Sequence, residues 1–336
     1  MKISDTGEFG LIELLTKGLV YDPATVIRGV GDDTAVLRTD GGKWLLFTTD
    51  MLVEEVHFAP AYSSWRQVGA KALAVNISDI AAMGGCPAHA LISIGIPRRL
   101  AVEDVVELYD GLKEMARVYR VNLVGGDTVA HPERLVINVA LLGEVEAGKA
   151  VLRSGARPGD WIFVTGTLGA SAAGLYLYQH PGTVCPSDAA DYCRQAHVNP
   201  LPRVDEGRLL AECGVTAMDD ISDGLAAELH QICQASGAGC LVRADAVPVA
   251  PEVREAASRA GKDPLEWALF GGEDFELVFT VAPGKFPELN RAMAKAGFCI
   301  YKVGEITAAG AGLLLALPDG GTAPLPDSGY DHFFRL

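Results

Sequence analysis

The sequence predicts a mixed α/β or α+β protein of two domains, and three observations carry this prediction. The chain has 336 residues, and a typical domain has about 150. Patterns typical of helices and of strands alternate along the whole chain. The composition is 49% hydrophobic and 21% charged, close to the globular average, which excludes a disordered chain, a collagen and a coiled coil.

The first half alternates helices and strands. Helices are predicted over residues 9–17, 65–83 and 102–118, the second of them ending at Gly84-Gly85, and strands over 43–49, 89–96 and 135–142. A short buried strand is predicted at 123–124. Turn-rich sequence from 146 to 160 follows, so we expect an N-terminal domain of residues 1–147 and a C-terminal domain of residues 148–336.

The second half restarts with a strand over residues 161–165. The glycine turn at 166–169 is expected to lead this strand tightly into a helix over 170–178, in preference to cradling a phosphate. The remaining predicted elements are helices over 203–213 and 224–236 and strands over 239–243, 275–281, 299–306 and 312–317.

The charge and the cysteines restrict the class of protein. A formal net charge of −15 opposes binding to nucleic acid and to anionic membranes. No apolar stretch reaches the roughly 18 residues that a membrane span needs, and residues 1–6 show no signal-peptide h-region. The seven cysteines are scattered and include no C-x-x-C pair. We therefore expect a cytoplasmic protein whose cysteines are reduced thiols of the core.

Acidic residues recur beside glycines or at the ends of predicted elements. Asp50 and Asp127 each end an apolar strand, and Asp223 begins a helix. Asp79 lies on a largely apolar face of the helix over 65–83, one turn after Asn76. The six motifs are Gly31-Asp32-Asp33, Thr48-Thr49-Asp50, Asn76-Ile77-Ser78-Asp79, Gly125-Gly126-Asp127-Thr128, Asp219-Asp220-Ile221-Ser222-Asp223-Gly224 and Gly271-Gly272-Glu273-Asp274.

These motifs favour metal-assisted phosphoryl transfer. A buried unpaired carboxylate costs several kcal/mol, so it is neutralised, paired or bound to metal. Carboxylate oxygens with few histidines or cysteines nearby favour Mg²⁺, Mn²⁺ or Ca²⁺, and Mg²⁺ is usually shared with substrate phosphates. The chain has no G-x-x-x-x-G-K-[ST] loop and no protein-kinase motifs, and Gly29-Val30-Gly31 lacks the third glycine of a dinucleotide site. A phosphotransferase of another fold is therefore expected.

The motifs match those of one family in order. The remaining matching segments are Gly7-Glu8-Phe9, Val56-His57-Phe58, the stretch from Lys71 to Gly84, Arg153-Ser154-Gly155, Phe275-Glu276-Leu277 and Gly329-Tyr330-Asp331-His332-Phe333. With them the chain resembles the thiamine-monophosphate kinase family, in the superfamily of aminoimidazole ribonucleotide synthetase and selenophosphate synthetase. The resemblance implies a two-domain aminoimidazole ribonucleotide synthetase-like fold, with an N-terminal sheet that pairs across a homodimer and a larger C-terminal α/β domain.

The resemblance also implies an activity and a set of site residues. The activity is ATP-dependent phosphorylation of thiamine monophosphate to thiamine diphosphate with several Mg²⁺ ions, by direct in-line transfer in which Asp220 and Asp223 are catalytic. The implied metal ligands are Asp33, Thr48 or Thr49, Asp50, Asp79, Asp127, Asp220 and Asp223. The implied nucleotide contacts are Gly126, Asp127, Arg153 and Ser222, and the implied substrate contacts are His57, Glu273 and Tyr330.

Two alternative functions stay open at this point. One is another ATP-dependent enzyme of the superfamily; the selenophosphate synthetases carry a reactive cysteine near the N-terminus, whereas the first cysteine here is Cys86. The other is an acidic metal-binding protein without catalysis, which needs no ordered set of motifs spanning both halves. Phe333 is expected in the core, and no role is assigned to residues 180–200.

Overall fold

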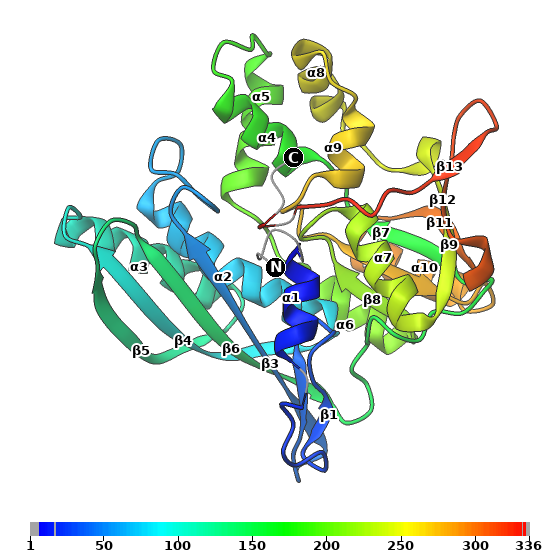
Figure 1. Cartoon of the computed structure of the whole chain (residues 1–336), viewed down its shortest axis with the longest axis horizontal. Helices are drawn as coiled ribbons and strands as arrows, with labels where there is room; N and C mark the ends of the chain where they lie inside the picture. Colours follow the sequence, from blue (N-terminus) through cyan, green and yellow to red (C-terminus); the bar gives the residue numbers. More distant parts are fainter. Residues whose placement is uncertain (1–6, 17, 331, 334–336) are drawn as a thin grey trace.

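The computed structural model describes residues 7–16, 18–330 and 332–333. Figure 1 shows two lobes, each built on one sheet. Three points of the sequence analysis fall on residues outside the described ones. They are the absence of an h-region in residues 1–6, the helix end at Lys17, and Asp331 in the last motif.

The N-terminal half forms a six-stranded sheet in the order β1-β2-β3-β6-β4-β5. Neighbouring strands are antiparallel except β4 and β5, which run parallel because helix α3 crosses between them. The strands are β1 (Val26–Arg28), β2 (Ala35–Arg38), β3 (Lys43–Val53), β4 (Cys86–Pro97), β5 (Asn122–His131) and β6 (Val136–Glu146).

Helices α2 (Trp65–Ala82) and α3 (Val102–Val118) cover one face of this sheet (Figure 1), and α1 (Gly7–Leu15) precedes it. A capping box starts α2, since Ser64 accepts from the backbone N–H of Gln67 and the Gln67 side chain accepts from that of Ser64. Among the residues that the structure describes, no layer of helices covers the opposite face of the sheet. It exposes large apolar side chains of β3, β4 and β5, namely Phe47, Met51, Leu91, Val124 and Val129.

The C-terminal half forms a seven-stranded sheet in the order β13-β12-β9-β11-β7-β10-β8. Its strands are β7 (Trp161–Thr165), β8 (Ala217–Asp220), β9 (Ala238–Arg243), β10 (Leu277–Val281), β11 (Ile300–Ala308), β12 (Leu313–Ala316) and β13 (Thr322–Pro324). Its helices are α4 (Ala170–Gln179), α5 (Ser187–Val198), α6 (Val204–Cys213), α7 (Leu225–Ser236), α8 (Pro251–Ala260), α9 (Pro264–Phe270) and α10 (Phe286–Ala296), with short 3₁₀ turns η2 (Ala244–Ala246) and η3 (Ala309–Ala311).

Helices cover both faces of this second sheet. Every residue of β10 is buried, and its side chains alternate between two apolar clusters. Val278 belongs to the cluster that α7 completes, whereas Leu277 and Phe279 belong to the cluster that α6 and α10 complete. β10 is therefore covered by apolar side chains on both of its faces.

Helix α2 joins the two lobes, because it packs on the first sheet and also on α6 and β8. The contact with α6 is close: a Cβ at Gly207 would lie 2.2 Å from the carbonyl oxygen of Ala81. Only glycine fits there. Residues near the end of α2 are therefore held against the start of the second lobe.

Most elements confirm the sequence analysis. The helices predicted over 65–83, 102–118, 170–178, 203–213 and 224–236 all form, within one or two residues at their ends. The turn at 166–169 does lead β7 into α4, and the backbone N–H of Gly169 donates to Asp274 rather than standing free for a phosphate. Among the described residues, no helix combines the length and apolar composition that a membrane crossing requires.

Four expectations were wrong. Asp50 and Asp127 lie inside β3 and β5 rather than at strand ends, because the backbone keeps pairing past them, Asp50 with Val139 and Asp127 with Ser93. The strand at 123–124 is not buried, since β5 is the sheet edge and Val124 is 59% exposed. All seven cysteines are free, but the core holds only Cys193, Cys233 and Cys240. Phe333 is 41% exposed instead of lying in the core.

Candidate active site

Five carboxylates from both lobes lie close enough to interact electrostatically. Asp33 comes from the loop between β1 and β2, Asp50 from β3, Asp79 from α2, and Asp219 and Asp220 from the end of β8. One carboxylate oxygen each of Asp33, Asp219 and Asp220 lies within 4.8 Å of the others. We call these five residues the carboxylate cluster.

Two hydroxyls orient the cluster. Thr48 Oγ1 donates to Asp79 Oδ2, and Ser78 Oγ donates to Asp220 Oδ2. Thr49 lies on the opposite face of β3, where its hydroxyl donates to the carbonyl oxygen of Val139. The strand alternation therefore decides which of the two threonine side chains reaches the cluster, and it is Thr48.

Burial and mutual repulsion disfavour the charged forms of these groups. Burial raises the pKa of Asp220 to about 8, and repulsion by the nearby charge of Asp33 contributes to this increase. Burial also raises the pKa of Asp50 to about 6, and that of Asp79 well above its ordinary value, again helped by neighbouring carboxylates. Asp50, Asp79 and Asp220 are therefore more readily protonated than ordinary carboxyl groups.

Arg153 is the cation that the chain itself supplies to the cluster. Its Nη2 lies 2.5 Å from Asp33 Oδ1, and its Nε lies 2.9 Å from Asp219 Oδ2. Its backbone N–H donates to Asp32 Oδ1 at 2.7 Å. Arg153 was assigned to nucleotide by resemblance, and the structure places it between two carboxylates of the cluster.

The cluster has the chemistry of a divalent cation site. Asp33 Oδ2 and Asp219 Oδ1 are buried and accept no hydrogen bond from the described residues, whereas Asp219 Oδ2 is ion-paired with Arg153 Nε. A single guanidinium does not satisfy five buried carboxylates. Hard oxygen donors with unused lone pairs fit Mg²⁺ or Mn²⁺.

A cavity of about 430 Å³ opens beside the cluster. Asp50 and Asp79 line it, and so do the three residues assigned to substrate by resemblance, His57, Glu273 and Tyr330. Ser222 and Asp223, at the start of α7, also line it. The fold thus brings residues from positions 50 to 330 to one cavity, which we call the substrate cavity.

The polar groups of the substrate cavity are held in defined orientations. His57 Nδ1 accepts from the backbone N–H of Val53 at 3.0 Å, so the neutral ring carries its proton on Nε2 and can donate there. Glu273 Oε1 lies 2.7 Å from Lys71 Nζ, and Glu273 Oε2 lies 3.2 Å from His197 Nδ1. Tyr330 is 47% exposed at the cavity edge.

The sequence analysis missed several residues of this site. Lys71 lies two helical turns before Asp79 on the same face of α2, so the periodicity that singled out Asp79 was also a signal for Lys71. His197 lies in the segment to which no role was assigned, and no sequence signal pointed to it. Asp219 is the first residue of the motif over 219–224, but the sequence analysis did not assign it a role in metal binding.

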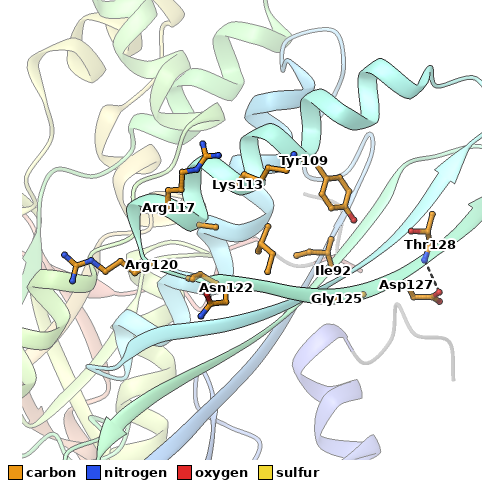
Figure 2. A pocket seen from close by; sticks show the side chains of 13 residues that line it. Ile92, Tyr109, Lys113, Arg117, Arg120, Asn122, Gly125, Asp127 and Thr128 are labelled. Atoms are coloured by element: carbon orange, nitrogen blue, oxygen red, sulfur yellow. Dashed lines mark hydrogen bonds between the residues drawn. The ribbon is translucent and has the colours of Figure 1, made fainter.

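Asp127, labelled in Figure 2, and the neighbouring Gly126 are not among the residues that line the substrate cavity. They line a second cavity, of about 880 Å³, between β5 and α3, with Tyr109, Lys113 and Arg117 of α3. A Cβ at Gly126 would lie 1.7 Å from the carbonyl oxygen of Ile92, so this position needs glycine. We call this space the edge cavity.

Strand order explains the separation. Asp50 and Asp127 lie on β3 and β5, with β6 and β4 between them. Three strand spacings amount to about 14 Å. Of the carboxylates that the resemblance implies as metal ligands, Asp33, Asp50, Asp79 and Asp220 therefore lie together within one chain and Asp223 lies on the cavity wall, whereas Asp127 does not join them.

Comparisons with known proteins agree with this architecture. The AIR synthase related protein N-terminal domain matches residues 31–145, and the corresponding C-terminal domain matches residues 157–314. The thiamine-monophosphate kinase of Bacillus subtilis is 38% identical over 327 residues, which cover 97% of this chain and 99% of that protein. That of Escherichia coli K12 is also 38% identical and covers 97% of this chain and 98% of its own length.

A solved structure extends the likeness to three dimensions. The AaThiL complex with AMPPCP and TMP superposes with a TM-score of 0.86 at 36% identity and covers 99% of both chains. Sequence identity above 30% over nearly the whole length, together with the same two-lobed fold, places the chain in a family. The chain belongs to the thiamine-monophosphate kinase family of AIR synthase related proteins.

Proposed function

We propose that the chain transfers the γ-phosphoryl group of ATP to the phosphate of thiamine monophosphate, forming thiamine diphosphate, with several Mg²⁺ ions bound by the carboxylate cluster. The observation that carries the proposal is that Asp50 and Asp79 belong both to the cluster and to the wall of the substrate cavity. A phosphate seated in that cavity lies beside the cations. Metal ions would supply charge neutralisation between two anions.

The residues of the chain position the acceptor. His57 Nε2 donates to the substrate phosphate, because its Nδ1 already accepts from Val53. Tyr330 presents an aromatic face to the cationic thiazolium at the cavity edge. Glu273, ion-paired with Lys71, lies on the cavity wall beside the organic part of the substrate. Ser78 and Thr48 hold Asp220 and Asp79 in place, so the carboxylates need no reorganisation when the reaction starts.

The transfer is direct and forms no phosphoenzyme. The nucleophile is a phosphate oxygen that is already ionised near neutral pH, so no strong general base is needed. The nearest candidate for a covalent nucleophile with a base is Ser171 beside His197. His197 contacts both Ser171 Oγ and Glu273 through the same atom, Nδ1, whereas a serine triad uses both ring nitrogens.

The edge cavity is the proposed nucleotide site. Tyr109 offers a ring for the base, and Lys113 and Arg117 offer cations for the phosphates (Figure 2). Gly126 and Asp127 line this cavity, whereas Ser222 and Arg153 belong to the region of the substrate cavity and the cluster. The residues assigned to ATP by resemblance are therefore divided between two places in one chain.

We propose that a homodimer brings the two groups of ATP-assigned residues together in one site. The first sheet exposes Phe47, Met51, Leu91, Val124 and Val129 on its uncovered face, and its edge strand β5 carries Asp127. A second copy paired there would bury this apolar surface. It would also carry the Asp127 of one protomer toward the cluster of the other.

The proposed domains are residues 1–147 and 148–336. This division is supported by the end of β6 at Glu146 and the start of β7 at Trp161, which leave the turn-rich segment between the two sheets. A cytoplasmic location remains a proposal from the scattered cysteines, none of which forms a disulfide.

The test is an assay of the purified chain with ATP, Mg²⁺ and thiamine monophosphate, in which thiamine diphosphate is separated and quantified. Formation of thiamine diphosphate that EDTA abolishes is the expected result. Absence of product at any divalent cation would overturn the proposal and favour another superfamily activity or metal binding alone. Label from γ-labelled ATP retained on the denatured protein would refute the direct route.

A further inference from the structure

A buried network connects three side chains on the wall of the substrate cavity. Lys71 of α2 lies 2.7 Å from Glu273, which in turn lies 3.2 Å from His197 at the end of α5. The side chains of Lys71 and His197 are 4% and 3% exposed. Lys71 Nζ also donates to the carbonyl oxygen of His57 at 3.1 Å. Elements from both lobes therefore meet around one carboxylate.

The positive charge of Lys71 balances the negative charge of Glu273. Burial opposes ionisation of Glu273, but its cationic surroundings, led by the charge and the hydrogen bond of Lys71, outweigh it and lower its pKa, so the group stays a carboxylate. Its charge is already paired inside the protein. Glu273 is therefore not available as the counter-charge of a cationic ring. Its two oxygens are instead held against neighbouring side chains of the protein.

One of these neighbours is the ring of His197, whose tautomer follows from its contacts. Burial, with Lys71 nearby, lowers the pKa of His197 to about 4, so the ring is neutral near pH 7. Its Nδ1 lies 3.2 Å from a carboxylate oxygen of Glu273, which only accepts hydrogen bonds, and 3.1 Å from Ser171 Oγ, a hydroxyl that can also accept. An unprotonated Nδ1 would set its lone pair against the carboxylate, and so Nδ1 carries the proton. Nε2 is then an acceptor. It is buried and has no hydrogen-bond partner among the described residues.

A flat aromatic surface lies next to this acceptor. The ring of Tyr62, which also lines the cavity, has its centroid 5.8 Å from that of His197. Tyr62 is stacked on Tyr178 with centroids 4.5 Å apart, which holds it in place. An acceptor beside a rigid ring suits a planar heterocycle that carries an N–H donor at its edge.

We infer that His197 Nε2 accepts a hydrogen bond from the exocyclic amino group of the substrate's pyrimidine, and that His197 thereby decides between amino and oxo pyrimidines. The inference rests on the proposed function, since thiamine monophosphate carries such an amino group. Lys71 and Glu273 are positioning residues that fix the tautomer. An oxo group would place two acceptors against each other.

The test compares kcat/KM for thiamine monophosphate and for oxythiamine monophosphate, in which an oxo group replaces the amino group. The wild type is expected to prefer the amino compound by at least about tenfold. In His197→Leu this preference falls to within about threefold of unity, mainly through KM for the amino compound. His180→Leu, at an exposed histidine that ends the neighbouring helix α4, keeps the wild-type preference.

A purely structural role for His197 predicts equal losses for both compounds and an unchanged preference, which would overturn the inference. A second measurement does not depend on the variant's folding. In wild-type protein with ¹⁵N-labelled histidine, Nε2 of His197 should give the shift of an unprotonated nitrogen that moves when thiamine monophosphate binds. A protonated Nε2 overturns the inference. A wild type that phosphorylates neither compound refutes the proposed function itself, whereas turnover without discrimination refutes the inference alone.

Discussion

Ser78 Oγ donates a hydrogen bond to Asp220 Oδ2, although the two residues are 142 positions apart. The bond ties α2 of the first lobe to the end of β8 in the second, next to Asp79. The orientation of a central carboxylate therefore depends on how the two lobes pack. Asp220 and its neighbours are the first place to test the proposed chemistry.

Replacing Asp220 by Asn is expected to lower kcat by at least roughly 10²–10³, the loss typical of one preorganised electrostatic contact. Asp223→Asn, on the cavity wall, is expected to fall in the same range. Ser78→Ala should cost less, about tenfold, because the carboxylate remains and loses only its orientation. Steady-state kinetics at saturating ATP and thiamine monophosphate give these values. Wild-type kcat in Asp220→Asn would remove Asp220 from the metal site.

Arg153→Met should destabilise the fold by about 3–5 kcal/mol in EDTA, since it leaves Asp33 and Asp219 buried without their cation. Mg²⁺ should recover part of this loss, because a bound cation replaces the missing charge. Urea unfolding with EDTA and with Mg²⁺ measures both effects. The matched control is Arg157→Met at an exposed arginine of the same segment, which should stay within about 0.5 kcal/mol of wild type. An equal loss with and without Mg²⁺ would argue against a cation at the cluster.

Mixing two inactive variants tests the proposed homodimer. Asp50→Asn and Asp127→Asn should each be inactive alone. If one protomer supplies Asp50 and the other Asp127 to the same site, a mixed dimer has one doubly damaged site and one intact site. Unfolding and refolding the two variants together should then restore up to about a quarter of wild-type activity, because half of the dimers are mixed and each has one working site. No recovery in dimers verified as mixed would mean that each chain forms its site alone.

Truncating Tyr330 to Ala should raise KM for thiamine monophosphate by about 2–30-fold, corresponding to a cation over an aromatic ring, and leave KM for ATP unchanged. The melting temperature should change little, because Tyr330 is 47% exposed. Tyr21→Ala, at a fully exposed tyrosine, is the control and should alter neither KM. Equal damage to both KM values with a lower melting temperature would assign Tyr330 to holding the C-terminal segment.

The pH dependence of stability should report His197. Its pKa is about 4 in the folded chain, against an ordinary value of 6.5, so between these values the unfolded chain binds a proton that the folded chain does not. Native stability therefore falls as pH decreases through this window. The groups facing the ring are Lys71, Glu273, Tyr62 and Tyr178.

His197→Leu removes this dependence. Its free energy of unfolding, compared with wild type, should improve by up to about 1.4 kcal/mol per pH unit as pH falls from 6.5 to 4, and should run parallel to wild type above pH 7. Urea unfolding of both proteins from pH 4 to 8 measures the difference. Parallel curves over the whole range would show that His197 titrates as it does in the unfolded chain.

The long helices could be predicted from the sequence because their signals are local. The helix over 65–83 is specified by a capping box at Ser64, by periodic apolar residues and by Gly84, and α2 forms there. Strand β8 could not be found in this way. It ends in Asp219 and Asp220, which look like turn chemistry, and only its place at the sheet edge against α2 buries them.

By itself the sequence determined the family, through many carboxylates beside glycines in the order of one family's motifs, and it predicted oxygen ligands for a hard cation and residues for a phosphate and a ring. Tertiary structure alone decided which groups meet. Strand alternation put Thr48 at the cluster and Thr49 on the other face, and strand order put Asp127 in the edge cavity. Packing of the two lobes set Lys71 and His197 around Glu273. Propensity and periodicity act over a few residues, whereas these distances depend on how whole sheets and helices bury their faces against one another.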